Sequence, residues 1–160
     1  MDLILWRHAE AQDHPMGAAG DQGDHADMAR RLTPKGEKQA ARMARWLDGL
    51  LPQGTRIISS PARRAEQTVA ALGRKYRLDD QIRPGASADA LLDACRWPES
   101  RLPVLLVGHQ PSLGQVVARL LDMAPGECSV RKGAVWWLRY RERDDESTVV
   151  VRCVMAPDML

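Results

Sequence analysis

Three short, continuous apolar runs constrain the fold of this chain more than any other feature of its sequence. They are LILW (residues 3–6), RIISS (56–60) and PVLLVGH (103–109). Unbroken runs of this length are typical of strands that are buried on both faces of a parallel sheet. The second and third runs lead directly into segments with helical periodicity, which makes two strand-then-helix units. We therefore predict a three-layer α/β/α sandwich with a mainly parallel central sheet.

The remaining segments complete this plan. LTPKGEKQAARMARWLDGLL (32–51) has the periodicity of a helix. QIRP (81–84) is predicted as a short strand and SADALLDACRW (87–97) as a helix. Near the end of the chain, AVWWLRY (134–140) and STVVVRCVM (147–155) flank the polar turn RERDDE. That pattern predicts a C-terminal antiparallel hairpin.

Residues 12–30 separate the first predicted strand from the first predicted helix and are rich in Gly, Asp, Ala and His. A connection of this length in a compact domain is usually functional or mobile. We interpret it as a lid or specificity loop, with plain surface disorder as the alternative. Thr33 is the predicted N-cap of the helix that follows, with Pro34 at its first position. His14 and His25 lie in the loop without the spacing of metal ligands, so a metal site is not expected.

The size and charge of the chain argue against several classes of protein. Its 160 residues suffice for one core, so we predict a single domain over 1–160. The formal net charge is +2 and the basic residues are dispersed, which argues against a nucleic-acid partner. Cys95, Cys128 and Cys153 lie too far apart for a zinc or redox motif. A strand that begins at Asp2 leaves no room for a signal peptide, and no apolar run could span a membrane, so we expect a cytoplasmic protein.

Charged side chains follow each of the three apolar runs. Arg7 and His8 follow the first run, Arg63 and Arg64 begin the helix after the second, and His109 ends the third. Each of these residues alone is more often structural than functional. In parallel α/β sheets, however, ligands bind outside the carboxyl ends of the strands, where these residues should meet. Arginine guanidinium groups beside helix N-termini predict an anion-binding site at this edge of the sheet, and a phosphoryl group is the favoured ligand.

Two imidazoles at a phosphoryl site indicate covalent chemistry. A neutral imidazole can attack phosphorus through one ring nitrogen if an acceptor holds its other N–H. A second imidazole, kept protonated by the phosphate, can stabilise the charge on the equatorial oxygens. One histidine would therefore be the nucleophile, and the other would bind the phosphoryl oxygens.

Four segments of the chain also resemble a known family. They are LILWRHAEA (3–11), RRLTPKGEKQA (30–40), IISSPARRAEQTVAAL (57–72) and VLLVGHQPSLGQVVARLL (104–121). On these segments the sequence resembles the histidine phosphatase superfamily, and within it the small phosphohistidine phosphatases of the SixA type. One segment alone would be weak support, but all four occur in the family's order across most of the chain.

The resemblance implies a role for each residue at the predicted site. His8 would be the nucleophile and become transiently phosphorylated, and Arg7 would bind phosphate beside it. The motif places the second phosphate-binding arginine at Arg64, which leaves Arg63 on the surface, and the second histidine at His109. No metal or other cofactor is implied.

The resemblance also implies a substrate. A phosphohistidine on a phosphorelay or phosphotransferase protein is the implied substrate, and no nucleic acid or membrane is involved. One alternative is a phosphatase of small phosphomonoesters or phosphoramidates with the same chemistry. The other is a non-catalytic phosphoryl-binding regulatory domain.

Two departures from the family pattern concern the chemistry. The family usually has glycine where this chain has Ala9, whose methyl group could restrict the backbone or crowd the ligand. Larger members carry a glutamate general acid in an insertion for which this chain is too short. Glu10 and Asp89 are the candidate acids, although Glu10 could equally be a structural partner and Asp89 a helix-start residue. A site without a clear general acid favours a phosphoramidate substrate such as phosphohistidine, because imidazole is a better leaving group than an alkoxide.

Overall fold

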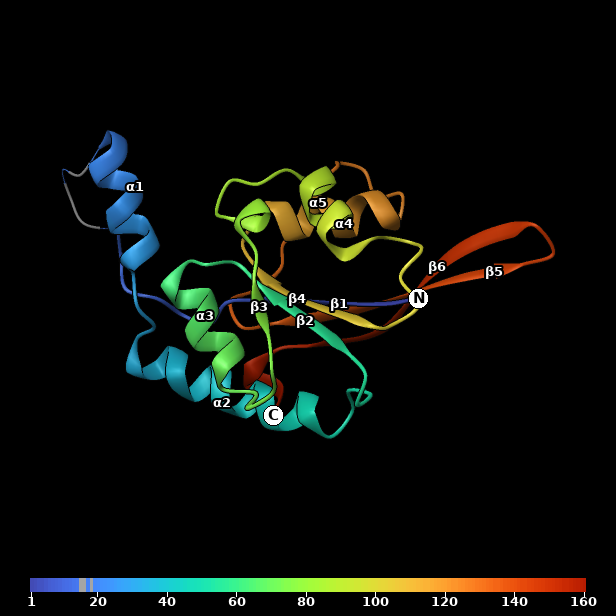
Figure 1. Ribbon diagram of the computed structural model, residues 1–160, viewed down its shortest axis with the longest axis horizontal. Coiled ribbons are helices and arrows are strands. Elements are labelled where there is room, and N and C mark those ends of the chain that lie inside the picture. Colours follow the sequence, from blue (N-terminus) through green and yellow to red (C-terminus); the bar gives the residue numbers. More distant parts are fainter. Residues whose placement is uncertain (15–16, 18) are drawn as a thin grey trace.

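A six-stranded mixed sheet forms the centre of the molecule, as shown by a computed structural model that describes residues 1–14, 17 and 19–160 (Figure 1). The strands are β1 Asp2–Arg7, β2 Arg56–Ser59, β3 Arg77–Leu78, β4 Val104–Gly108, β5 Val135–Arg143 and β6 Glu146–Met155. Across the sheet they lie in the order β3-β2-β4-β1-β5-β6.

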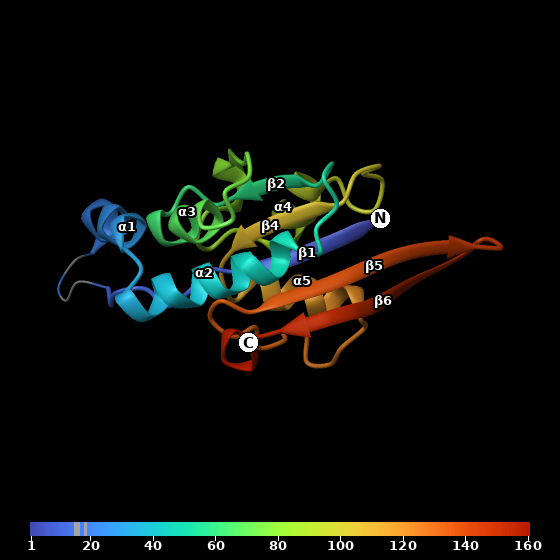
Figure 2. The same ribbon diagram turned by 90° about the horizontal axis from the view of Figure 1, so that it is seen from below.

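The three apolar runs form the middle of this sheet. β4 lies between β2 and β1 and pairs in parallel with both, and β2 also pairs in parallel with β3. β5 is antiparallel to β1, and β6 is antiparallel to β5. The mainly parallel sheet and the C-terminal hairpin are therefore confirmed. Figure 2 shows the hairpin of β5 and β6 extending beyond the other strands.

Helices cover both faces of the sheet, which confirms the three layers (Figure 1). The helices are α1 Gly20–Ala29, α2 Pro34–Asp48, α3 Arg63–Ala70, α4 Ala88–Cys95 and α5 Ser112–Leu120, with the short 3-10 helices η1 Asp80–Ile82 and η2 Pro157–Met159. Leu3 and Leu5 of β1 face the core beneath α4 and α5, whereas Ile4 and Trp6 face the core beneath α2 and α3. This alternation follows from the two-residue period of a strand.

The predicted loop over residues 12–30 is wrong for its second half, where α1 forms. Gly23 is the buried residue of this helix, so α1 has no apolar stripe from which periodicity could have identified it. Residues 15, 16 and 18 of the proposed lid lie outside the described residues. The next helix begins as expected, because the Thr33 side chain accepts a hydrogen bond of 3.0 Å from Gly36 N.

Two smaller expectations also need correction. The segment 81–84 is not a strand: η1 occupies its start, and the edge strand is the two-residue β3. The turn of the C-terminal hairpin is shorter than RERDDE, because the strands continue to Arg143 and resume at Glu146. Asp144 and Asp145 alone form the turn, with φ angles of 53° and 63°, the left-handed conformation that two-residue hairpin turns require. No helix within the described residues is long and apolar enough to cross a membrane.

Candidate active site

The carboxyl ends of β1, β4 and β2 bring the two predicted histidines together. His8 N donates to the Gly108 carbonyl at 3.1 Å, and Ser60 N donates to the Val107 carbonyl at 3.0 Å, so the three chain ends are adjacent. The ring centroids of His8 and His109 are 5.2 Å apart, and the ring planes are inclined by 50°. Both side chains are buried. The parallel register therefore places two imidazoles at one edge of the sheet.

His8 is held in a single tautomer by the residue that follows it. Its Nδ1 lies 2.7 Å from the carbonyl oxygen of Ala9. Because a carbonyl can only accept, the neutral ring carries its proton on Nδ1 and keeps a lone pair on Nε2. Burial, together with the positive charges of Arg64 and Arg7, lowers the pKa of His8 to about 3. At neutral pH, Nε2 is therefore an unprotonated nitrogen that can act as a nucleophile.

His109 is oriented by Ser60, the last residue of the RIISS run, for which the sequence pattern predicted no role of its own. The Ser60 hydroxyl lies 2.7 Å from His109 Nε2 and also accepts a hydrogen bond of 3.2 Å from Ala62 N. With that lone pair engaged, the hydroxyl can donate its proton to Nε2, which leaves the proton of His109 on Nδ1. Burial, and then the charges of His8 and Arg64, lower the pKa of His109 to about 2.

Three buried nitrogen donors at this edge have no hydrogen-bond partner among the described residues. They are Arg7 Nε, Arg64 Nε and His109 Nδ1. A buried donor without a partner costs free energy, so a cluster of three indicates a ligand with several acceptor oxygens. Two of the donors belong to guanidiniums, so that ligand is an anion.

The two arginines of α3 face different surroundings. Arg64 is only 4% exposed, whereas Arg63 is exposed. The helix turns successive residues by about 100°, so only one of the pair can face the histidines. The structure thus brings Arg7, His8, Arg64 and His109 together and leaves Arg63 outside.

Asp27 of α1 joins this group, although the sequence analysis did not identify it. Arg64 Nη1 donates to the Asp27 carbonyl at 2.8 Å, and Arg64 Nη2 donates to the Asp27 carboxylate at 3.2 Å. Arg30 binds the other oxygen of that carboxylate at 2.9 Å. Burial acts to raise the pKa of Asp27, but the bonds and charges of Arg30 and Arg64 lower it below its ordinary value. The available signal was the i,i+3 spacing of Asp27 and Arg30, which is informative only if the segment is known to be helical.

The two candidate acids are each paired with another side chain. The Glu10 carboxylate accepts a hydrogen bond of 3.0 Å from the Thr33 hydroxyl and lies 3.7 Å from Lys35 Nζ, at the start of α2. Asp89 is paired with Arg119, in the last turn of α5, whereas His109 precedes the first turn of that helix. Glu10 therefore has the structural partners that were its alternative interpretation, and Asp89 is not brought to the histidines.

Ala9 fits its position without crowding the site. It is fully buried in a small apolar cluster with Ala11, Leu32 and Ala40. Its backbone N–H donates to the Thr68 hydroxyl at 3.1 Å. Ala9 is not among the residues with positive φ, so the conformational freedom of glycine is not required here.

Within the described residues, no group of three or more His, Cys, Asp or Glu side chains is arranged to hold a metal ion.

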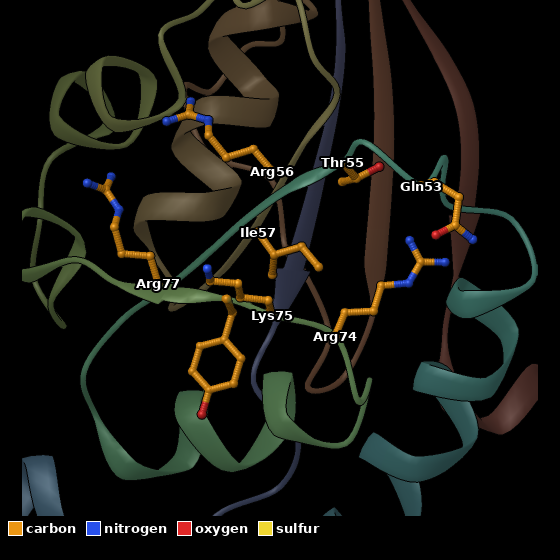
Figure 3. A pocket seen from close by; sticks show the side chains of 8 residues that line it. Gln53, Thr55, Arg56, Ile57, Arg74, Lys75 and Arg77 are labelled. Atoms are coloured by element: carbon orange, nitrogen blue, oxygen red, sulfur yellow. The ribbon is translucent and has the colours of Figure 1, made fainter.

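A separate cavity of about 470 Å³ lies at the amino end of β2, the opposite end of that strand from the histidines (Figure 3). Its lining includes Arg56, Arg74, Lys75 and Arg77. Arg74 is already bonded to the Asp48 carboxylate at 2.7 Å and to nearby carbonyls. Arg56 binds two carbonyls at the end of α4. These guanidiniums are engaged in holding the fold, in contrast to the unpartnered donors beside the histidines.

Comparison with known proteins shows the family to which this chain is similar. Residues 3–87 match the family model described as histidine phosphatase superfamily (branch 1). The chain is 31% identical over 136 residues to phosphohistidine phosphatase SixA of Escherichia coli, with 79% of this chain and 76% of that protein covered. It is 29% identical over 135 residues to the phosphohistidine phosphatase SixA homolog of Haemophilus influenzae, with 75% and 77% covered.

Comparison of structures points to the same group of proteins. The structure of the protein histidine phosphatase SixA complexed with tungstate matches with a TM-score of 0.74 at 25% identity, and 99% of each chain is covered. The structural match therefore extends beyond residues 3–87 to nearly the whole chain, which includes β4 and the His109 that follows it.

Proposed function

The chain belongs to the histidine phosphatase superfamily and is a phosphatase, and from this premise we propose that it hydrolyses phosphohistidine carried by another protein. His8 is the proposed nucleophile, and Arg7, Arg64 and His109 are the proposed ligands of the phosphoryl oxygens. The observation that carries the proposal is the group of three buried, unpartnered donors beside an imidazole whose Nε2 is unprotonated.

The first step transfers the phosphoryl group to the protein. His8 Nε2 attacks phosphorus, the bond from phosphorus to the substrate imidazole breaks, and its electron pair stays on the departing nitrogen, which takes a proton from water. The equatorial oxygens accept hydrogen bonds from Arg7, Arg64 and His109 as negative charge develops on them. Because the lowered pKa of His109 results from burial and nearby positive charge, a bound phosphoryl anion raises that pKa and favours the imidazolium.

The second step regenerates the protein. Water attacks phosphorus, and the bond to His8 Nε2 breaks with its electron pair returning to that nitrogen. The attacking water passes one proton to bulk solvent, which replaces the proton that the leaving imidazole took in the first step, and inorganic phosphate leaves. The Ala9 carbonyl accepts the hydrogen bond of His8 Nδ1, with 2.7 Å between the nitrogen and the oxygen, and this bond keeps the orientation of the ring between the two steps.

The positions of the carboxylates support phosphohistidine over an alkyl phosphate. Glu10 is bonded at the start of α2, and Asp89 is paired with Arg119. Asp27 lies at the site, but its pKa is lowered, so it is ionised at neutral pH and is a poor proton donor. An imidazole leaving group needs little help from an acid, whereas an alkoxide needs much more.

Three further features support the proposed partner, compartment and domain organisation. Two relatives with similar sequences are named as a phosphohistidine phosphatase and its homolog, which supports a protein that carries phosphohistidine, of the phosphorelay or phosphotransferase type, as the partner. The three cysteines are all free thiols, which supports a reducing compartment such as the cytoplasm. The two apolar cores share one sheet, which supports one domain over residues 1–160.

The test is to trap the intermediate. The protein is mixed with a ³²P-labelled phosphohistidine protein, quenched within milliseconds and digested, and acid-labile label is sought on the peptide that contains His8. His8→Gln should show no label and no turnover, whereas His25→Gln, at an exposed histidine, should behave like the wild type. A His8→Gln variant that hydrolyses the donor at the wild-type rate would disprove the assignment. Faster turnover of p-nitrophenyl phosphate than of the phosphohistidine protein would instead favour small phosphomonoesters.

A further inference from the structure

Arg64 is held by two acceptors that come from the same residue. The Asp27 carbonyl accepts from Nη1 at 2.8 Å, and the Asp27 carboxylate accepts from Nη2 at 3.2 Å. The third nitrogen, Nε, is buried and has no partner among the described residues. Asp27 therefore binds both terminal nitrogens of the guanidinium and does not bind Nε.

Arg7 is also held by the protein through a terminal nitrogen. Its Nη1 donates to the Val130 carbonyl at 2.8 Å, and its Nε is also buried without a partner. In both arginines a terminal nitrogen is fixed by the protein and the inner nitrogen is left free. This repetition indicates that the external acceptors aim the guanidiniums and do not occupy the phosphoryl position.

The geometry of a guanidinium explains how such a contact acts at a distance. The group is planar and rigid, so an acceptor that fixes one edge also fixes the direction of the others. We propose that Asp27 is a positioning residue of the phosphatase reaction, which orients Arg64 so that its Nε–H is directed at the phosphoryl group. This inference rests on the proposed phosphoryl site and adds to it a residue that does not touch the substrate.

The charge balance agrees with this role. The Asp27 carboxylate is shared between Arg64 and Arg30, with one oxygen bonded to each. Arg7, Arg64 and Arg30 together bring three positive charges, and all three lower the pKa of His8. One carboxylate among three guanidiniums leaves the site positive, so Asp27 can fix Arg64 without removing the attraction for a phosphoryl dianion.

The alternative is that Asp27 competes with the substrate for Arg64. The two roles predict opposite effects on anion binding, which vanadate and inorganic phosphate can report. If Asp27 positions Arg64, Asp27→Ala should weaken the binding of both anions and raise KM about tenfold, as outer partners of active-site ligands often do. Asp27→Asn, which keeps a side-chain oxygen as acceptor, should retain most of the affinity. Asp24→Ala, at an exposed carboxylate on the same helix, is the matched control and should bind as the wild type does.

A double-mutant cycle separates positioning from a general loss of structure. In an Arg64→Ala background, Asp27→Ala should weaken vanadate binding no further, because Asp27 acts through Arg64. The inference would be overturned if Asp27→Ala still weakened vanadate binding in the Arg64→Ala background. It would also be overturned if the single variant Asp27→Ala bound the anions as tightly as the wild type or more tightly. If His8 is labelled normally and only these variants disagree, the inference alone fails. If the wild-type protein binds neither anion and His8 is not labelled, the proposed function fails with it.

Discussion

Lowering the pH from 7.5 to 5.5 should destabilise this protein through His8 and His109. Both are buried as neutral rings, with pKa values lowered to about 3 and about 2. In the unfolded chain an imidazole has a pKa of about 6.5. Over this interval the unfolded chain therefore binds up to two protons that the folded protein does not, and stability must fall as the pH falls.

The magnitude follows from these values. For one imidazole that stays neutral in the folded protein, protonation of the unfolded chain between pH 7.5 and 5.5 lowers the free energy of unfolding by roughly 1–2 kcal/mol. Two such rings together lower it by about 3 kcal/mol, a large share of the roughly 5–15 kcal/mol that stabilises an ordinary domain. Asp2 and Asp27 also have lowered pKa values. Their contribution to the free energy of unfolding, however, is fully present above the carboxyl pKa of the unfolded chain and is lost only at more acidic pH.

The assay is urea unfolding at pH 7.5, 6.5 and 5.5. Between pH 7.5 and 5.5, the free energy of unfolding of the wild type should fall by most of the expected amount. In His8→Gln and in His109→Gln it should fall by about half as much, and in the double variant it should fall little. His25→Gln, at an exposed histidine, should keep the wild-type dependence. Saturating phosphate should reduce this fall in the free energy of unfolding, because a bound anion raises both imidazole pKa values. An equal loss in the wild type and the double variant would show that these rings are not the buried neutral groups described above.

Four other results are expected. Arg64→Ala should lower kcat/KM about a hundredfold or more, whereas Arg63→Ala should stay within about twofold because its side chain is exposed; comparable losses would contradict the geometry. Glu10→Gln and Asp89→Asn should leave kcat on phosphohistidine within about twofold, since a general acid would be worth at least a hundredfold, and a larger drop would identify an acid. Ser60→Ala should lower kcat/KM about tenfold by releasing His109, and His109 ring signals in NMR that are unchanged by the substitution would count against this. Ala9→Gly should lower the free energy of unfolding by about 1 kcal/mol with kcat unchanged, and a marked rise in kcat would show that the methyl group does crowd the ligand.

Elements with a strong apolar pattern could be predicted from the sequence, and elements without one could not. The unbroken run of β1 and the stripe of α2 required burial, so their type could be inferred before any contact was known. α1 buries Gly23 and offers no such stripe. β3 is two exposed residues whose identity as a strand depends on pairing with β2. Neither feature is encoded in local periodicity.

The sequence by itself determined which residues stand at the carboxyl ends of the central strands. LILW, RIISS and PVLLVGH must be buried, and the chain leaves the core where each run ends, so Arg7, His8 and His109 had to emerge at one edge of a parallel sheet. The type of ligand followed from their chemistry, because guanidiniums and imidazoles that meet without enough carboxylates attract an anion.

Only the tertiary structure decided how these groups are held. The Ala9 carbonyl fixes the His8 tautomer, Ser60 orients His109, and Asp27 binds Arg64 across 37 positions of the chain. Each of these contacts consists of one or two directional hydrogen bonds, in which a carbonyl or carboxylate oxygen accepts or a hydroxyl takes part. Such bonds depend on the local backbone conformation, as between His8 and Ala9, or on where two segments meet in space. They leave no periodic mark in the sequence because they bury no apolar face.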